Sequence, residues 1–409
     1  MLCFFSIAVT ANSDDWPCWR GLGGNGISGE ALWNPAALRE GPKVVWSARV
    51  GQGHSAVSIV NGLLYTQGSG DFGQNGKMTY HEKVFCLNAV TGEEVWQFCY
   101  PCKSISYAGP RATPLVNGSR LYTLGARGQL YCFDALTGDV LWKKDLVSER
   151  LSRLSPWGFG GSPVIHGDTL LLNVGGAGLA LNKVTGSVIW KSANSKCGVA
   201  TPVLAEIRGK PIALMNTEYS LYAVEVSTGE RIWTCPWAYC DADPVLVRDK
   251  IFLFGGKPAN QRCRTLLNIA DGKPEVVWPE KEMNVAFQSW IVSRGYAYGF
   301  TWDKKTHRLQ CIDLSSGEFK WRRVIDDWGS LSMADAYIIF LEGDGDLVII
   351  KASPESYQEI SRASVLDIKD FDDYPQYQPN VCWTAPVLCN GKIYVRDSYG
   401  NIACVDLGR

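Results

Sequence analysis

Apolar residues in this chain gather in short runs, and polar or glycine-containing turns separate one run from the next. In the stretch from Ala112 to Trp142 the runs cover residues 113–116, 121–124, 130–134 and 140–142. Short runs with turns between them are typical of β-strands, and the pair Asn117-Gly118 is typical of a tight hairpin turn. The stretch therefore predicts four antiparallel strands.

The four-strand pattern repeats along the chain, and a tryptophan marks the last strand of most copies. The marker residues, 43 to 50 positions apart, are Trp46, Trp96, Trp142, Trp190, Trp233, Trp278 and Trp321. A four-stranded propeller blade repeats at about 40 to 45 residues, so the spacing predicts an all-β propeller. We interpret these tryptophans as packing residues, because indole adds buried area and an N–H donor toward a neighbouring blade.

Two further motifs keep the same register. The turn before the last strand is repeated as Thr91-Gly92, Thr137-Gly138, Thr185-Gly186, Thr228-Gly229, Asp271-Gly272 and Ser316-Gly317. The first strand opens on Thr113-Pro114, Ser162-Pro163, Thr201-Pro202, Asp243-Pro244 and Ala385-Pro386. Proline is tolerated in a strand at the edge of a sheet, which places the first strand innermost, beside a central channel.

Two counts give the number of blades. The seven marker tryptophans and one degenerate copy near Ile360 make eight last strands, and the third strands also number eight. Residues 41–50 form a last strand with no blade before it, and residues 402–406 form a third strand with no last strand after it. We therefore predict an eight-bladed β-propeller of four-stranded antiparallel blades, closed by pairing of the N-terminal strand into the C-terminal blade.

Composition supports one folded domain over residues 14–409. Hydrophobic residues make up 46% of the chain, and the 42 glycines and 16 tryptophans suit many short strands joined by tight turns. Lys and Arg total 40 against 41 Asp and Glu, a net charge of −1. No broad positive field attracts nucleic acid or anionic membranes, so neither is expected as a partner.

Residues 1–13 differ from the repeats and resemble a leader. They contain an apolar run that ends in Val9-Thr10-Ala11, a small-residue pattern of the kind that precedes signal cleavage. We expect export to the periplasm or the outside of the cell. The basic start of a signal peptide is absent, so an apolar terminus of a cytoplasmic protein is the alternative. No other stretch approaches the roughly 18 to 20 apolar residues of a membrane span.

The 14 cysteines weigh against export unless many are structural. Four of them share one position in the middle of a third strand, where cysteine behaves as a small buried apolar residue. These are Cys86, Cys132, Cys311 and Cys404.

Two close cysteine pairs follow marker tryptophans. Cys99 and Cys102 form a CxxC motif, and Cys235 and Cys240 form a second pair. Loop disulfides and unpaired thiols are both consistent with this spacing. Residue 103 is lysine rather than the histidine of a haem-attachment motif.

A candidate ligand site lies at the mouth of the channel. Several tryptophans outside the marker register stand just before or within an innermost strand, with polar residues at equivalent positions. The candidate residues are His54, Arg111, Trp157, Asp241, Asp243, Gln288, Trp290, Trp328 and Trp383, together with Trp237 and Thr384. A concave mouth with aromatic walls and convergent polar groups is a common ligand site, although blade openings also need aromatic residues for packing.

No catalytic constellation can be assembled from the sequence. The run Glu342-Gly343-Asp344-Gly345-Asp346 looks like a calcium loop, but it lacks the length and final glutamate of an EF-hand. It falls where the seventh blade needs a hairpin turn, so we interpret it as a turn. The four histidines are scattered, and we assign no catalytic residue and no metal ligand.

Three motifs carry a resemblance that covers nearly the whole chain. They are Asp15-Trp16-Pro17-Cys18-Trp19-Arg20-Gly21, Leu130-Tyr131-Cys132-Phe133-Asp134-Ala135 and Thr137-Gly138-Asp139-Val140-Leu141-Trp142. They resemble the pyrroloquinoline-quinone-like propeller repeat family and, within it, exported bacterial proteins related to BamB. The resemblance implies the fold more strongly than a function, because propellers host many activities.

The resemblance implies two functions. Quinoprotein dehydrogenases of the family hold the quinone against a disulfide of adjacent cysteines, beside calcium and an Asp base. This chain has no adjacent cysteine pair and is shorter than those enzymes. BamB-like members resemble binding scaffolds, although this sequence lacks their lipid-anchor cysteine.

The sequence therefore predicts a monomeric, exported, non-catalytic propeller that binds an envelope protein or a small ligand through its channel face. The alternative is an alcohol or sugar dehydrogenase that uses pyrroloquinoline quinone and calcium. No cofactor is assigned in the leading interpretation.

Overall fold

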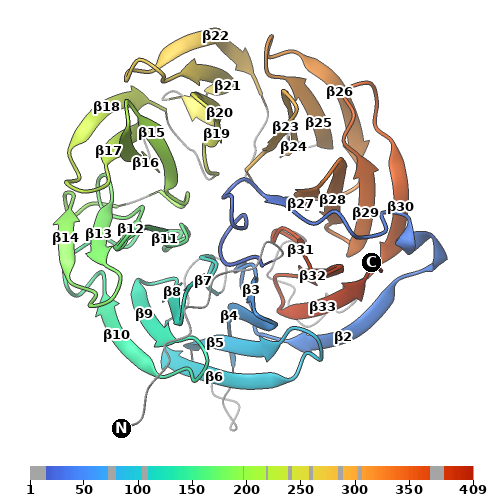
Figure 1. The fold of residues 1–409 in the computed structure, drawn as a ribbon, viewed down its shortest axis with the longest axis horizontal. Coiled ribbons are helices and arrows are strands. Elements are labelled where there is room, and N and C mark those ends of the chain that lie inside the picture. The colour runs from blue at the N-terminus through green and yellow to red at the C-terminus, as the bar shows by residue number, and fades with distance from the viewer. Residues whose placement is uncertain are drawn as a thin grey trace, which may run out of the picture.

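A computed structural model of the chain describes residues 15–71, 80–103, 109–196, 198–217, 220–237, 242–257, 261–283, 289–302, 306–368 and 382–408. In this part of the chain, eight sheets, each built on four antiparallel strands, are arranged around a central channel (Figure 1). The predicted eight-bladed, all-β propeller is therefore confirmed. Its helical content among the described residues is one short 3₁₀ turn, η1 (Ala37–Glu40).

Each blade runs from an innermost to an outermost strand. Blade one contains β3 (Ser58–Val60), β4 (Leu63–Asp71), β5 (Tyr80–Asn88) and β6 (Glu94–Pro101). Blade two contains β7 (Leu115–Asn117), β8 (Arg120–Leu124), β9 (Gln129–Asp134) and β10 (Val140–Asp145). Blade three contains β11 (Val164–His166), β12 (Thr169–Leu172), β13 (Leu179–Asn182) and β14 (Val188–Lys191). Blade four contains β15 (Val203–Ile207), β16 (Lys210–Asn216), β17 (Ser220–Glu225) and β18 (Arg231–Pro236).

The second half of the ring follows the same order. Blade five contains β19 (Val245–Val247), β20 (Lys250–Lys257), β21 (Gln261–Asn268) and β22 (Glu275–Glu282). Blade six contains β23 (Ile291–Ser293), β24 (Tyr296–Trp302), β25 (His307–Asp313) and β26 (Phe319–Ile325). Blade seven contains β27 (Gly329–Ala334), β28 (Tyr337–Glu342), β29 (Asp346–Lys351) and β30 (Glu359–Ser364). Blade eight contains β31 (Val387–Cys389), β32 (Lys392–Arg396), β33 (Asn401–Asp406) and β2 (Lys43–Arg49).

Strand β2 closes the ring as predicted. It pairs antiparallel with β33, from Lys43 opposite Asp406 to Arg49 opposite Asn401. Arg396 adds a second closure at the channel side, because its fully buried guanidinium donates to the carbonyl oxygens of Ser55, Gln67 and Gly51 in and before blade one. Strand β2 thus completes blade eight, and Arg396 of β32 binds that blade to β4 of blade one and to the connection before it.

The marker tryptophans join neighbouring blades at the outer rim. The indole of Trp142 donates to the carbonyl oxygen of Lys183 at 3.1 Å and lies against Gly186 of the next blade. A Cβ at Gly186 would come within 2.8 Å of the ring, and the φ of +70° also favours glycine. Trp46, Trp96, Trp190 and Trp278 repeat both contacts with their own neighbours. The Trp and Thr-Gly motifs are therefore two halves of one junction.

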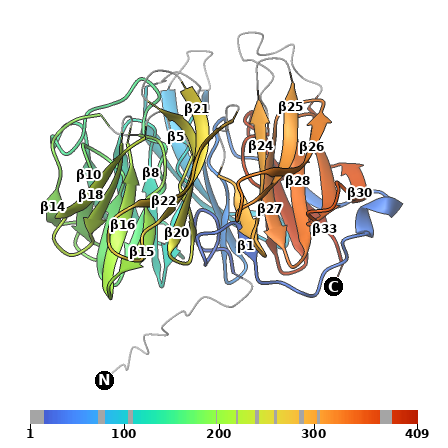
Figure 2. The ribbon, with the colours of Figure 1, turned by 90° about the horizontal axis from the view of Figure 1, so that it is seen from above.

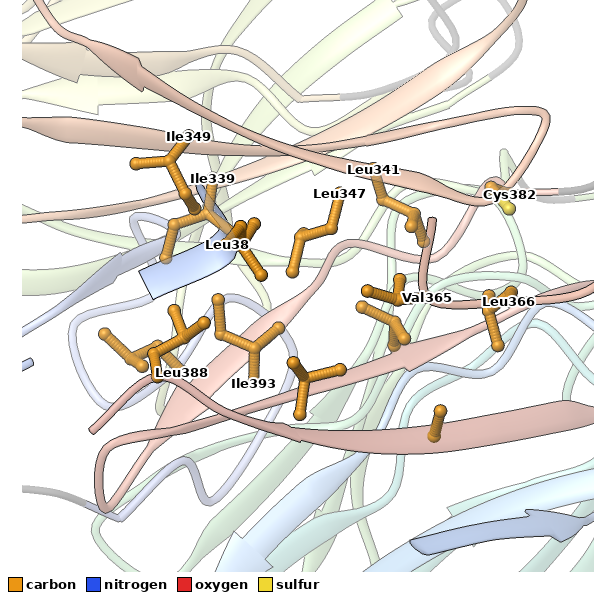
Figure 3. Packing of buried hydrophobic residues seen from close by; sticks show 14 of the residues in the cluster. Leu38, Ile339, Leu341, Leu347, Ile349, Val365, Leu366, Cys382, Leu388 and Ile393 are labelled. Carbon is orange, nitrogen blue, oxygen red and sulfur yellow. The ribbon is translucent and has the colours of Figure 1, made fainter. Parts of the chain in front are cut away.

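The hydrophobic core is divided among the blade junctions. Eight clusters of buried residues occur among the described residues, and each joins two adjacent sheets. Figure 3 shows the cluster between blades seven and eight, where Ile339 and Leu341 of β28 face Leu388 and Ile393 across the gap and Leu38 of η1 fills one end. Burial between blades, rather than within one blade, makes the ring the cooperative unit.

Blade seven is the exception in the ring. It has no Thr-Gly turn, and β1 (Ile27–Ser28) adds to its inner strand β27 as a fifth, parallel strand. On the outer side, Arg39 of η1 donates to the carbonyl oxygen of Ile360 in β30. The N-terminal segment therefore covers both edges of the degenerate blade.

The ring has two different ends, which Figure 2 shows from the side. We call the end with the connections between blades the loop face, and the end with the Asn-Gly and Thr-Gly turns the turn face. The hairpin turns at Asn61-Gly62 and Asn390-Gly391 have positive φ at both residues, as predicted. In blade two Asn117 instead pairs with Arg120, so the turn consists of Gly118 and Ser119, one position later than predicted. No helix among the described residues is long and apolar enough to cross a bilayer.

Candidate binding site at the central channel

The channel is partly filled by the N-terminal plug, which we define as residues 16–26. Trp16 forms an antiparallel bridge with Ile59 of blade one, and Met333 in blade seven donates its N–H to the carbonyl oxygen of Gly26. Between these ends, the guanidinium of Arg20 donates to the carbonyl oxygen of Trp290 at 2.9 Å. The plug thus bridges blades one, six and seven. The first of the three motifs that carry the family resemblance, residues 15–21, forms the first half of this plug.

A partial ring of hydrogen bonds joins the segments that open the innermost strands of blades two to six. Ser162 donates its N–H to Thr201 Oγ1 at 3.0 Å, and Thr201 donates its N–H to Asp243 Oδ1 at 2.7 Å. The same bond runs from Thr113 N–H to Ser162 Oγ and from Asp243 N–H to Ser289 Oγ. In blades three to five the residue before the proline therefore accepts a bond from its counterpart in the preceding blade, and Ser289 does the same in blade six. This explains why Ser, Thr and Asp occupy that position in these blades.

Asp243, a predicted ligand residue, belongs to this inner ring. Its second oxygen, Oδ2, accepts the indole N–H of Trp19 at 2.6 Å, and the residue is only 5% exposed. Both carboxylate oxygens are thus bonded to the protein itself. The structure gives Asp243 the role of holding the plug to blade five.

Three of the predicted residues come together at the loop face. The rings of His54 and Trp383 are 5.2 Å apart, and those of Trp383 and Trp328 are 5.5 Å apart, measured between centroids. Two residues that the prediction missed extend this group, since Trp302 and His307 lie 5.1 and 5.5 Å from Trp328. We call these five residues the loop-face aromatic cluster; they come from blades one, six, seven and eight.

The electrostatics of the cluster keep His54 uncharged. Burial, together with the positive charges of Arg111 and Arg396, lowers the pKa of His54 to about 3. Its Nδ1 is buried and makes no hydrogen bond within the described structure. On the other side of the cluster, burial raises the pKa of Asp327, which accepts the N–H of Trp328. A polar ligand group could bond His54 without displacing a protein partner.

The other predicted residues are not part of this cluster. Trp290 is fully buried against Phe252 and Phe254 and supports the wall between blades five and six. Trp157 is 51% exposed. Trp237 and Thr384 are buried and hydrogen-bond to backbone carbonyls. Asp241 and Gln288 lie outside the described residues.

His307 and Trp302 could have been found by topology. They flank the turn between the second and third strands of blade six, and such turns lie on the loop face together with the connections between blades. A pattern search along the sequence treats them as an isolated hairpin, because their neighbours in space come from other blades.

The cysteine pairs show no disulfide in the described part of the chain. Cys99 is exposed and Cys102 is buried, and both are free. Cys99 lies in β6 and Cys102 just after its end, and the structure agrees with the unpaired alternative for both. Cys235 lies in β18, and its predicted partner Cys240 lies outside the described residues. The four third-strand cysteines are fully buried, as expected.

The acidic run in blade seven forms a turn, as predicted. Glu342 ends β28, Asp346 begins β29, and Gly345 between them has a φ of +94°. The carboxylates of Glu342, Asp344 and Asp346 lie within 4.8 Å of one another. Arg362 forms ion pairs with Glu342 and Asp346, so this cluster already has a cation.

Pyrroloquinoline quinone and calcium, which the sequence resemblance implies for dehydrogenases, do not fit the described channel. Asp243, a carboxylate in the described channel wall, is already bonded to Thr201 and Trp19. Trp19 and Arg20 of the plug occupy space beside it. We therefore derive no reaction step through the quinone.

Comparison with known proteins agrees with this arrangement. A family model described as outer membrane protein assembly factor BamB matches residues 80–323. Outer membrane protein assembly factor BamB from Yersinia pestis is 24% identical over 387 residues, which cover 89% of this chain and 78% of that protein.

Solved structures share the fold. BamB from Moraxella catarrhalis superposes with a TM-score of 0.61 at 17% identity and covers 89% of this chain and 97% of its own. Quinohemoprotein alcohol dehydrogenase from Comamonas testosteroni superposes with a TM-score of 0.66 at 12% identity, over 98% of this chain and 82% of its own. At such identities these likenesses concern the fold alone. Because the family model matches more than half of the sequence, the chain belongs to the family of outer membrane protein assembly factor BamB.

Proposed function

We propose that this chain is an exported, non-catalytic scaffold of the cell envelope that takes part in assembling outer membrane proteins. Membership of the BamB family carries this proposal, because the relatives bear the name of that process. The interior of the channel supports it. Polar residues there, such as Thr201 and Asp243, bond to other parts of the protein and serve its framework.

The loop-face aromatic cluster is the part of the scaffold that we propose binds a protein partner. Partly exposed aromatic side chains are the residues that most often dominate protein interfaces. Trp302, Trp383 and His54 keep part of their surface accessible, while Trp328 beneath them is 6% exposed and holds them in place. A rigid group on four blades suits a partner that is recognised without rearrangement of the ring.

Complementation tests this function. The chain, given an export signal, is produced in a bacterium that lacks its own BamB, and the amounts of outer membrane proteins are measured. We expect recovery with the natural chain and with Trp157→Ala, and reduced recovery with Trp383→Ala. The amount of each variant in the envelope is measured in parallel, which separates lost binding from lost folding.

Two outcomes contradict the proposal. If the natural chain reaches the envelope folded and restores nothing, participation in assembly is wrong. If Trp383→Ala restores as much as Trp157→Ala, the partner binds elsewhere.

The alternative function is a quinone-dependent alcohol or sugar dehydrogenase. We test it because the chain shares its fold with a quinohemoprotein alcohol dehydrogenase. Purified protein is titrated with pyrroloquinoline quinone and calcium, and alcohol-dependent dye reduction is followed. We expect neither a bound-quinone spectrum nor turnover. Calcium-dependent binding with turnover would replace the scaffold proposal.

A further inference from the structure

The N-terminal plug fills only one side of the channel. Between the plug and blades two to five lies a cavity of about 710 Å³. It reaches from the exposed end of β7 and its turn, at Asn117 and Gly118 on the turn face, to the buried residues Thr201 and Asp243. The cavity is therefore separate from the loop-face aromatic cluster and opens toward the opposite end of the ring.

The lining of this cavity is mainly aliphatic. Ile165, Leu204 and Leu246 come from the inner strands of blades three, four and five, and each is only partly buried. Leu22 of the plug faces the same space and is 63% exposed. Apolar side chains that stay exposed in a concave site favour an apolar occupant.

The cavity wall also contains strand edges whose backbone N–H and C=O groups can form hydrogen bonds. Strands β11, β15 and β19 are the terminal strands of their sheets, so among the described residues each has one edge without a strand partner. A strand edge presents a row of N–H and C=O groups at fixed spacing. A small apolar molecule cannot satisfy such a row, whereas an extended polypeptide backbone can.

The chain itself provides two examples of this pairing in the same channel. Ile27 and Ser28 add to the inner edge of β27 as a parallel strand. Trp16 bridges Ile59 on the inner edge of β3. The inner edges of blades one and seven thus already accept extended backbone, and β15 offers the longest comparable edge in the cavity, with five residues.

We propose that this cavity binds an extended apolar segment of a partner polypeptide, which adds as a strand to the inner edge of β15. Five paired residues correspond to roughly 17 Å of extended chain. Backbone bonds to β15 hold the segment, and the aliphatic side chains of blades three to five select apolar residues. This gives the protein a second binding surface, on the side of the channel that faces away from the loop-face aromatic cluster.

The proposal is tested with purified full-length protein and a labelled peptide of eight alternating valines and threonines, with a lysine at each end. Binding is measured by fluorescence anisotropy. The comparison ligand is a depsipeptide with the same side chains, in which esters replace the amides and remove the N–H donors. We expect the peptide to bind and the depsipeptide to bind at least tenfold more weakly.

Variants locate the site. Leu204→Lys and Leu246→Lys each place a charge in the cavity, and we expect either change to weaken peptide binding at least tenfold. Ile189→Lys, on an exposed outer strand, is the matched control and should bind normally. Melting temperatures of all three are recorded, and two cavity variants are used so that one misfolded protein does not decide the test.

Each contrary result overturns a defined part of the proposal. No binding of the peptide removes the site, and equal binding of the depsipeptide removes strand addition. Unchanged binding by folded Leu204→Lys and Leu246→Lys places the peptide outside the cavity. Trp383→Ala should bind the peptide normally, so failure of the loop-face proposal and failure of this one are separate results.

Discussion

The blades of this propeller are joined twice, once at the outer rim and once at the channel, and the two junctions are built differently. At the rim, a large indole packs on a glycine of the next blade and donates one hydrogen bond, as Trp142 does to Lys183 beside Gly186. At the channel, small side chains such as that of Thr201 accept one N–H from the preceding blade. The rim junction depends on buried apolar area, and the channel junction on hydrogen bonds in a buried site.

The difference explains why polar residues near a channel are poor evidence of a ligand site by themselves. A buried hydroxyl or carboxylate that already accepts an N–H is part of the framework. Both carboxylate oxygens of Asp243 accept hydrogen bonds from the protein, whereas His54 has a buried nitrogen without a protein partner. Whether each polar atom already has a hydrogen-bond partner in the protein, more than the residue type, separates a framework residue from a candidate ligand residue.

The largest effect should come from removing residues 1–50, because this deletes β2, η1 and the plug together. Blade eight then loses its outer strand and blade seven loses both of its covers. We expect the cooperative thermal transition to be lost. Circular dichroism as a function of temperature measures this. A truncated chain that melts at the temperature of the full chain would mean that neither junction depends on ring closure.

The next effect concerns the rim junction. Trp278, 5% exposed and bonded to the carbonyl oxygen of Leu314, is changed to alanine. Loss of a buried tryptophan should lower the free energy of unfolding by about 3–5 kcal/mol, measured by urea denaturation. Trp157→Ala, at a half-exposed position, is the control and should lower it by less than Trp278→Ala does.

A smaller effect is expected at the channel junction. Thr201→Val keeps the shape of the side chain but leaves the N–H of Ser162 without its acceptor. The cost should be about 1–3 kcal/mol in the same urea experiment. Thr234→Val, on the exposed surface of β18, is the matched control. If Thr201→Val costs as much as Trp278→Ala, the distinction between the junctions is wrong.

The smallest effect is a difference in stability cost between two rim junctions, one with and one without an indole hydrogen bond. Trp190 donates to the carbonyl oxygen of Val226 at 2.7 Å, whereas the indole nitrogen of Trp233 has no hydrogen-bond partner in the described structure. Changing each to phenylalanine removes the donor. Trp190→Phe should therefore cost about 1 kcal/mol more than Trp233→Phe. Equal costs would show that packing alone sets the strength of the rim.

The rim could be predicted from the sequence because its parts are bulky, periodic and close together in each repeat. Trp142, Gly138 and the hairpin turns recur in register, and the count of last strands led to β2 as the closing strand. Even the degenerate blade near Ile360 was found by counting. Period and turn chemistry are local properties of the chain.

The channel could be predicted only in part. The cluster of His54, Trp328 and Trp383 was anticipated, since all three stand before innermost strands. The plug was not anticipated, because residues 16–26 follow no period and contact blades that are hundreds of residues away. No local pattern reports such contacts, and only the folded ring brings the partners together.

Closure by β2 also sets an order of events. Lys43 and Asp406 are 363 positions apart, so the strand that emerges early from a ribosome or an export channel must wait for nearly the whole chain before it can pair. Pairings between such distant segments form slowly, and an unpaired strand is prone to aggregation during the delay. In an exported chain, the time between the appearance of residue 43 and that of residue 406 is the interval in which a chaperone would be needed most.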